Sequence, residues 1–341
     1  EEEDGTGLLA NLEMLSWITT QISFYITFIL SFGFSAFARI IRWSEPVHAF
    51  AKSFDRKLPR GLEPLPSWEK LSARVVRILG QNPSSHHLQG TNTYLIGTGK
   101  ERVLIDAGEG MADYHRLLEM VLQEVGCETI SAVILTHWHI DHVGGVKKLL
   151  SRFPDAKVYK RKNPRKEDFA YLGIQDGQIF QVEGATLKAV YTPGHTEDHC
   201  SFILEEDKAL LCGDMILGCG TAVFDELYSY MTSLKKARTI AEEQNIQKLY
   251  VGHGPHIEID AVAKIDWYIQ HRMSREEQIL HTFKIHSSQT LTSVQITRNV
   301  YGNIPIFVFP SAHFNVEHHL DKLMKEGKIQ KQFGYAWKLI L

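Results

Sequence analysis

The chain has 341 residues, of which 44% are hydrophobic and 23% are charged, and its formal net charge is −3. This composition is ordinary for a globular protein, and the length is sufficient for a catalytic domain with a smaller second domain. The four cysteines show no CxxC spacing and are too sparse for a disulfide scaffold, which fits a reducing compartment.

The first 61 residues are predicted to be a leader followed by a linker. Residues 14–38 carry no formal charge, and Arg39 and Arg42 follow them directly. Such a segment is long enough to span a bilayer, and the excess of basic residues after it would place the following domain on the cytosolic or matrix side. Thr, Ser, Gln and Gly dilute its hydrophobicity, so an interfacial helix, or a segment absent from the mature enzyme, stays an alternative. Three prolines within residues 58–68 then indicate the linker.

Residues 62–256 are predicted to form an α+β domain. Apolar or alternating runs predict strands at residues 74–79, 93–96 and 102–105, with Asn92 in the preceding turn. Further strands are expected within residues 176–191 and 201–211, and an amphipathic helix at 111–125. Strands therefore dominate the predicted interior, and helices lie between groups of them.

The stretch THWHIDHVGG, residues 136–145, holds the densest group of candidate metal ligands. It places three imidazoles and one carboxylate in six positions: His137, His139, Asp141 and His142. An apolar run precedes the stretch and a helical pattern follows it, so the ligands lie in a loop between strand and helix. Nitrogen and oxygen donors without thiolate favour zinc or a similar divalent ion.

Three later turns supply further candidate ligands. His195, Asp214 and His253 each follow an apolar run and come directly after a glycine, which lets the backbone approach a ligand closely. Together with the four earlier residues they provide enough donors for two ions.

Residues 157–166 (KVYKRKNPRK) form a basic tract, with six basic residues and no acidic one. Such a run is usually a solvated face. Beside a hydrolytic centre it would also suit a polyanionic strand, through phosphate contacts and base stacking. The candidate substrate-binding residues are therefore Asn92, Tyr159, Lys160, Arg161 and Lys162.

Residues 257–341 are predicted to form a winged-helix-like domain. Helices are expected at 257–272, 274–283, 291–300 and 314–325, the second opened by a capping box between Ser274 and Glu277. Two short strands around Gly334 follow. Winged-helix modules bind nucleic acid or act as structural supports, and the weakly basic segment 316–325 favours the supporting role.

The ligand motifs, with Asp106 in VLIDAG as the first, match the five motifs of the metallo-β-lactamase superfamily. The resemblance implies a four-layer αββα sandwich that binds two zinc ions per chain. One zinc would be held by His137, His139 and His195, the other by Asp141, His142 and His253, and Asp214 would bridge them. Asp106 would orient the histidine loop.

Four stretches narrow the resemblance: ILGQNPSSHHLQGTNTYLIGTG, YTPGHTEDH, GDMILGCGTAVFDELYSYMTSL and LDKLMKEGKI. They closely resemble the β-lactamase-like protein 2 group, whose members are endoribonucleases that act on single-stranded RNA in mitochondria. The resemblance implies a matrix enzyme that cleaves RNA with a hydroxide shared by the two zincs. Its expected catalytic residues are Asp141, Asp214 and, as a candidate general acid, His199. A homodimer and a location on the cytosolic face stay open.

Two other function classes remain open from the sequence. Glyoxalase II enzymes and carrier-protein thioesterases share the metal motifs, and the same centre could hydrolyse a thioester. A non-catalytic scaffold is disfavoured because all seven ligand positions hold competent side chains.

Overall fold

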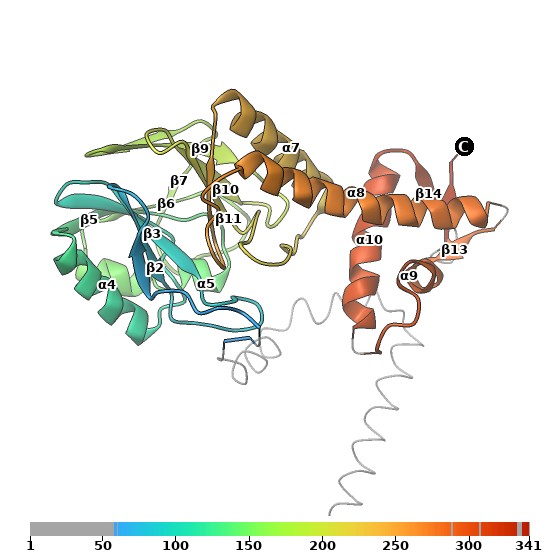
Figure 1. The fold of residues 1–341 in the computed structure, drawn as a ribbon, viewed down its shortest axis with the longest axis horizontal. Coiled ribbons are helices and arrows are strands. Elements are labelled where there is room, and N and C mark those ends of the chain that lie inside the picture. The colour runs from blue at the N-terminus through green and yellow to red at the C-terminus, as the bar shows by residue number, and fades with distance from the viewer. Residues whose placement is uncertain (1–57, 60, 288, 307, 333–335, 341) are drawn as a thin grey trace, which may run out of the picture. The chain divides into compact units, whose positions relative to one another are not determined.

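The computed structural model describes residues 58–59, 61–287, 289–306, 308–332 and 336–340. The described residues belong to one unit of the chain (Figure 1). The predicted membrane segment at 14–38 lies outside the described residues. Among the helices that are described, none combines the length and apolarity needed to cross a bilayer.

Two β-sheets form the centre of the first domain. The first sheet has its strands in chain order: β1 (Trp68–Lys70), β2 (Val75–Leu79), β3 (Asn92–Ile96), β4 (Glu101–Ile105), β5 (Thr129–Ile134), β6 (Lys157–Lys160) and β7 (Leu172–Gly173). The second runs in the order β12 (Lys248–Val251), β11 (Ala209–Gly213), β10 (Cys200–Leu204), β9 (Ala185–Tyr191) and β8 (Ile179–Val182). Strands β4 to β7 are parallel, as are β11 and β12, so their carboxyl ends meet at one edge of each sheet.

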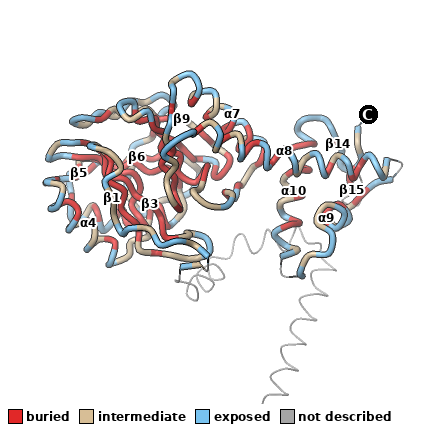
Figure 2. Tube along the Cα trace, in the orientation of Figure 1, coloured by how far each residue is buried: buried red, intermediate tan, exposed pale blue. Residues whose placement is uncertain are grey.

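Helices cover the outer faces of both sheets and complete four layers. An apolar cluster that includes Leu118 and Val133 packs α4 (Ala112–Glu124) and α6 (Val146–Arg152) on the first sheet. A second cluster, with Val75 and Phe202, fills the space between the sheets. Buried residues therefore follow the strands and the inward faces of the helices (Figure 2).

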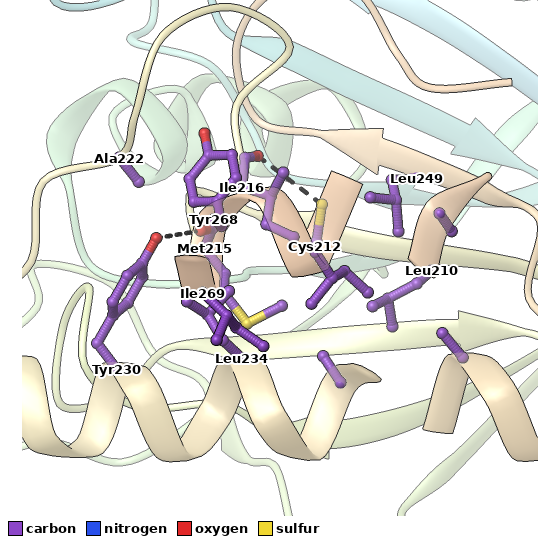
Figure 3. Packing of buried hydrophobic residues seen from close by; sticks show 14 of the residues in the cluster. Leu210, Cys212, Met215, Ile216, Ala222, Tyr230, Leu234, Leu249, Tyr268 and Ile269 are labelled. Carbon is purple, nitrogen blue, oxygen red and sulfur yellow. Dashed lines mark hydrogen bonds between the residues drawn. The ribbon is translucent and has the colours of Figure 1, made fainter. Parts of the chain in front are cut away.

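The third cluster packs α7 (Leu227–Glu243) and α8 (Ala261–Ile285) against the second sheet. In Figure 3 the Tyr230 hydroxyl donates to the Met215 carbonyl at 2.7 Å, and the Cys212 thiol lies 3.8 Å from the Ile216 carbonyl. Cys212 is therefore part of the apolar core. These layers confirm the predicted αββα sandwich.

The C-terminal region is built from the end of α8 and four short elements with one longer helix. These are β13 (Leu291–Thr292), α9 (Ser293–Tyr301), α10 (Phe309–Lys325), β14 (Ile329–Gln332) and β15 (Ala336–Leu339). Strand β15 pairs with both β13 and β14, and a separate apolar cluster lies beneath this small sheet. The helices and terminal hairpin confirm the predicted winged-helix arrangement.

The prediction of two helices at 257–272 and 274–283 was wrong. Helix α8 is continuous through Ser274, because no glycine or proline interrupts it and both halves bury an apolar face. The N-cap is Asp260, whose carboxylate accepts from the Ala263 N–H at 3.0 Å. The capping box of this region lies instead between Thr292 and Gln295, at the start of α9.

Candidate metal centre

The candidate ligands follow strands β5, β9, β11 and β12, where the edges of the two sheets meet. Asp141 and His142 lie in the short helix α5 (Ile140–Val143) rather than in the predicted loop, and the other ligands lie outside helices. His137 and His142 are fully buried, and Asp141, His195, Asp214 and His253 are each less than a tenth exposed. Gly252 allows this closeness, since a Cβ there would lie 1.9 Å from Asp214 Oδ1. The sheets thus bring ligands from four distant segments into one site.

Three imidazoles form the first group. His139 Nδ1 lies 2.9 Å from His137 Nε2 and 3.0 Å from His195 Nε2, and the two Nε2 atoms are 3.2 Å apart. Three ring nitrogens therefore converge on one point.

The hydrogen bonds of the other ring nitrogens show which form these imidazoles take. Thr136 Oγ1 donates its single proton to Asp106, 2.9 Å away, so it accepts from His137 Nδ1–H, also at 2.9 Å. His195 Nδ1–H donates to the Val223 carbonyl at 2.8 Å. Both Nε2 atoms consequently present lone pairs to each other. Burial, and to a smaller extent the neighbouring His142, hold the pKa of His137 well below its ordinary value. A bound cation accounts for this arrangement, whereas a hydrogen bond does not.

Asp141, His142 and His253 form the second group. Asp141 Oδ2 lies 3.1 Å from His142 Nε2 and 3.3 Å from His253 Nε2. His142 Nε2 is buried and has no hydrogen-bond partner among the described residues, although the Asp141 and Asp214 carboxylates face it. The other ring nitrogen, Nδ1, lies 2.7 Å from Asp106 Oδ2. A buried donor atom without a partner fits a metal ligand.

Asp214 lies between the two groups. Its Oδ2 is 3.2 Å from His253 Nε2 and 3.6 Å from His195 Nε2, and its Oδ1 is 3.4 Å from His142 Nε2. The seven side chains form two clusters with closely spaced ligand atoms, the first containing Asp214. Their nitrogen and oxygen donors fit two divalent ions.

Asp106 connects the two groups through the loop that carries them. It accepts hydrogen bonds from the Thr136 N–H at 2.8 Å, from Thr136 Oγ1, and from His142 Nδ1. Its own backbone has φ 61°, in the left-handed region that a non-glycine residue rarely adopts. This carboxylate therefore fixes the orientation of imidazoles in both groups.

The surroundings of Asn92 differ from those predicted from the sequence. Asn92 is the first residue of β3 rather than part of a turn, and its Nδ2 donates to the carbonyls of Val251 and Gly254, both at 2.9 Å. It clamps the loop that carries His253 and is only 1% exposed, so it does not fit a substrate-binding role.

His199 does not fit the predicted role of general acid. Its side chain is fully buried, and burial lowers its pKa to about 3. Its Nδ1 lies 2.9 Å from Thr192 Oγ1, and its Nε2 faces Gly213. A neutral, enclosed imidazole of this kind has no proton to deliver to a leaving group.

The basic tract is only partly a surface. Lys160 is fully buried and forms ion pairs with Asp198 at 2.8 Å and Glu167 at 2.9 Å. Tyr159 packs edge-on against Phe180, with ring centroids 5.0 Å apart. The substrate-binding prediction was therefore wrong for Lys160, because its side chain enters the interior and pairs with buried carboxylates. Tyr159 is partly exposed, and its role in substrate binding stays a prediction.

The rest of the tract stays accessible. Lys162 and Arg165 are exposed, and Arg161 is partly exposed. The Arg161 guanidinium lies 3.6 Å from the centre of the Tyr191 ring, and that of Arg165 lies 3.3 Å from the centre of the Trp138 ring.

Three residues near the ligands were not singled out from the sequence. Trp138 lies beside His139, with ring centroids 4.4 Å apart. His87 stacks on His253 at 5.4 Å, and Thr91 Oγ1 donates to Asp141 Oδ2 at 2.9 Å. Only Trp138, which sits between two ligands in the sequence, carried a signal that could have identified it.

Comparisons with known proteins agree with this geometry. Residues 88–253 match the family described as the metallo-beta-lactamase superfamily, and residues 292–337 match the beta-lactamase associated winged helix domain. The chain belongs to the metallo-β-lactamase superfamily of hydrolases, with an associated winged-helix domain at its C-terminus.

Among its relatives is the beta-lactamase-like protein 2 homolog of Caenorhabditis elegans. The two are 43% identical over 279 residues, which cover 80% of this chain and 91% of the relative. An atrochrysone carboxyl ACP thioesterase of Aspergillus fumigatus is 38% identical over 288 residues, covering 82% of this chain and 89% of that one. A beta-lactamase domain protein from Burkholderia ambifaria has the same fold, with a TM-score of 0.66 at 16% identity over 84% of this chain and 97% of its own. The resemblance indicated by the motifs is thus confirmed at the level of the family.

Proposed function

We propose that the protein is a zinc-dependent endoribonuclease that hydrolyses single-stranded RNA. The observation that carries the proposal is the pair of guanidinium–aromatic contacts beside the ligands. Arg165 covers Trp138, which lies between His137 and His139, and Arg161 covers Tyr191, four residues before His195. Cations bind phosphates, and aromatic rings stack with unpaired bases, so this surface suits a single strand.

The residues of the site have separable roles in such a reaction. Two zinc ions held there would polarise the scissile phosphate and lower the pKa of the attacking water. The chain fixes the ligand geometry through Asp106 and Thr136, while Thr91 orients the Asp141 carboxylate. Asp214, which lies between the two groups, would position the attacking water and accept its proton.

Hydrolysis of a thioester is the second candidate, and a specific observation favours it. Two apolar residues next to the ligands are exposed. Ile140 follows His139 in the chain and is 48% exposed, and Val223, whose carbonyl accepts the hydrogen bond from His195, is 72% exposed. Apolar side chains at this position would suit an acyl group, and thioesterases are among the relatives of comparable identity. The cationic surface favours RNA, because a thioester requires no extended row of cations.

The accessible arginines give a direct test of the RNA proposal. The double change Arg161→Ala and Arg165→Ala should raise KM for a single-stranded oligonucleotide by about tenfold, because phosphate contacts are lost. A plot of the logarithm of the binding constant against the logarithm of the salt concentration should become less steep, by roughly 0.7 for each phosphate contact removed. Hydrolysis of a small phosphodiester, which does not reach the tract, should keep its kcat.

Lys157→Ala provides a matched control for this test. Lys157 is an exposed cation of the same tract but begins β6, at the opposite end from the ligand loops. The control should bind RNA like the original protein. Equal salt slopes for the control and the double variant would show that the tract is a solvated face, and would remove the main support for RNA.

The location and assembly of the protein remain predictions. We propose that it acts in the mitochondrial matrix, with the cytosolic face as the alternative, and that residues 14–38 associate with a membrane. A homodimer stays open, and its test is the mass of the full chain in solution.

A further inference from the structure

Residues Ala222–Glu226, which we call the connecting segment, hold the metal ligand His195. The Val223 carbonyl accepts the hydrogen bond from His195 Nδ1 at 2.8 Å. The Asp225 N–H donates to the carbonyls of Gly194 at 2.7 Å and His195 at 3.1 Å. Both the imidazole and the backbone of His195 are therefore fixed by this segment.

Arg272 of α8 holds the same segment from the other side. Its Nη2 donates to the Ala222 carbonyl at 2.8 Å, one residue before the carbonyl that binds His195. Its guanidinium carbon also lies 4.7 Å from the centre of the Phe224 ring. Figure 3 shows Ala222 close to Tyr268 of α8, whose hydroxyl donates to the Gly220 carbonyl at 3.0 Å.

The burial of the Arg272 guanidinium costs free energy of folding. The side chain is only 4% exposed, and no carboxylate within the described part of the chain forms an ion pair with it. A buried cation without an anionic partner loses its hydration, and here the carbonyl and the aromatic ring only partly replace it. The buried guanidinium of Arg272 is explained if its hydrogen bond to the Ala222 carbonyl has a function beyond stabilising the fold.

The winged-helix domain contacts the connecting segment as well. The ring of His318, on α10, meets Phe224 edge-on with centroids 5.2 Å apart. Lys325 of the same helix forms an ion pair with Glu226 at 3.2 Å. A continuous series of contacts thus runs from the winged-helix domain through the segment to His195.

We propose that Arg272 is a positioning residue of the metal centre, which sets the orientation of the His195 imidazole through the connecting segment. The winged-helix domain then supports the metal centre, because α10 contacts Phe224 and Glu226 of the same segment. The inference rests on the metal centre alone and holds whether the substrate is RNA or a thioester. Loss of the RNA proposal would therefore leave it intact.

The test compares Arg272→Met with the original full-length chain, both loaded with Co²⁺. Methionine keeps an unbranched apolar stem but removes the donor to Ala222. We expect about tenfold weaker binding of one Co²⁺ equivalent, within the range found when partners of metal-bound histidines are lost. The visible absorption bands of Co²⁺ should also shift, since they report the geometry of its ligands. Arg272→Lys, which keeps a donor and the charge, should restore part of both properties.

Arg77→Met is the matched control. It removes a buried cation of β2, on the first sheet, whose Nη2 donates to the Pro66 carbonyl at 3.1 Å and which lies outside the contacts that lead to His195. It should lower stability but leave the Co²⁺ spectrum and affinity unchanged. If Arg272→Met does not fold, Phe224→Leu, which removes the ring beneath the guanidinium, takes its place. An unchanged Co²⁺ spectrum and affinity in the folded variant, or changes equal to those of the control, would overturn the proposal.

Discussion

Replacement of Asp214 by asparagine is expected to lower kcat by about 10³-fold, with loss of one of two bound metal ions. The carboxylate lies between the two groups, with Oδ2 3.2 Å from His253 Nε2 and 3.6 Å from His195 Nε2. Asparagine keeps the shape but removes the charge that both ions would share. The 10³-fold loss of kcat corresponds to about 4 kcal/mol of lost transition-state stabilisation, which is typical of a disturbed metal centre.

The measurement combines kcat on a single-stranded oligonucleotide with metal analysis of the purified variant. Asp176→Asn is a suitable control, because that carboxylate pairs with Lys236 on the surface and touches no ligand. Retention of two ions and of kcat within tenfold of the original value would contradict the bridging position of Asp214.

Removal of metal with a chelator should abolish activity and lower Tm by about 10 °C or more. The first group leaves lone pairs facing each other, and the second leaves a buried Nε2 without a hydrogen bond. An ion present at 1,000 times its Kd stabilises the folded state by about 4 kcal/mol, and each kcal/mol shifts Tm by about 2–4 °C in a domain of this size.

Titration of metal back into the chelated protein gives the stoichiometry of that effect. Two equivalents of Zn²⁺ should restore both Tm and activity. Full recovery after one equivalent, or a Tm that chelation does not change, would contradict a centre with two ions.

Three of the ligand positions could be predicted because each combines two local features. His195, Asp214 and His253 follow an apolar strand and a glycine, and the fold brings the ends of these strands together. The structure shows why a glycine precedes a ligand: at Gly252 a Cβ would collide with Asp214.

The surroundings of other residues could not be predicted, because their partners are distant in the chain. Lys160 reads as one cation in a basic run, yet it is buried against Asp198, from the loop that follows β9. Asn92 resembles a turn residue until β12 supplies the carbonyl that it binds. Arg272 likewise acquires its role only through Ala222, fifty positions earlier. Tertiary contacts of this kind leave no periodic signal in the sequence.

A side-by-side assay of the zinc-loaded chain tests whether the metal centre cleaves RNA, as we propose. The substrates are single-stranded RNA, duplex RNA, single-stranded DNA and an acyl thioester, each measured as kcat/KM. We expect endonucleolytic cleavage of single-stranded RNA to be fastest and to disappear with chelator and in His139→Ala. A kcat/KM for the thioester at least tenfold above that for RNA, about 1.4 kcal/mol of transition-state preference, would contradict the claim and assign the site to thioester hydrolysis.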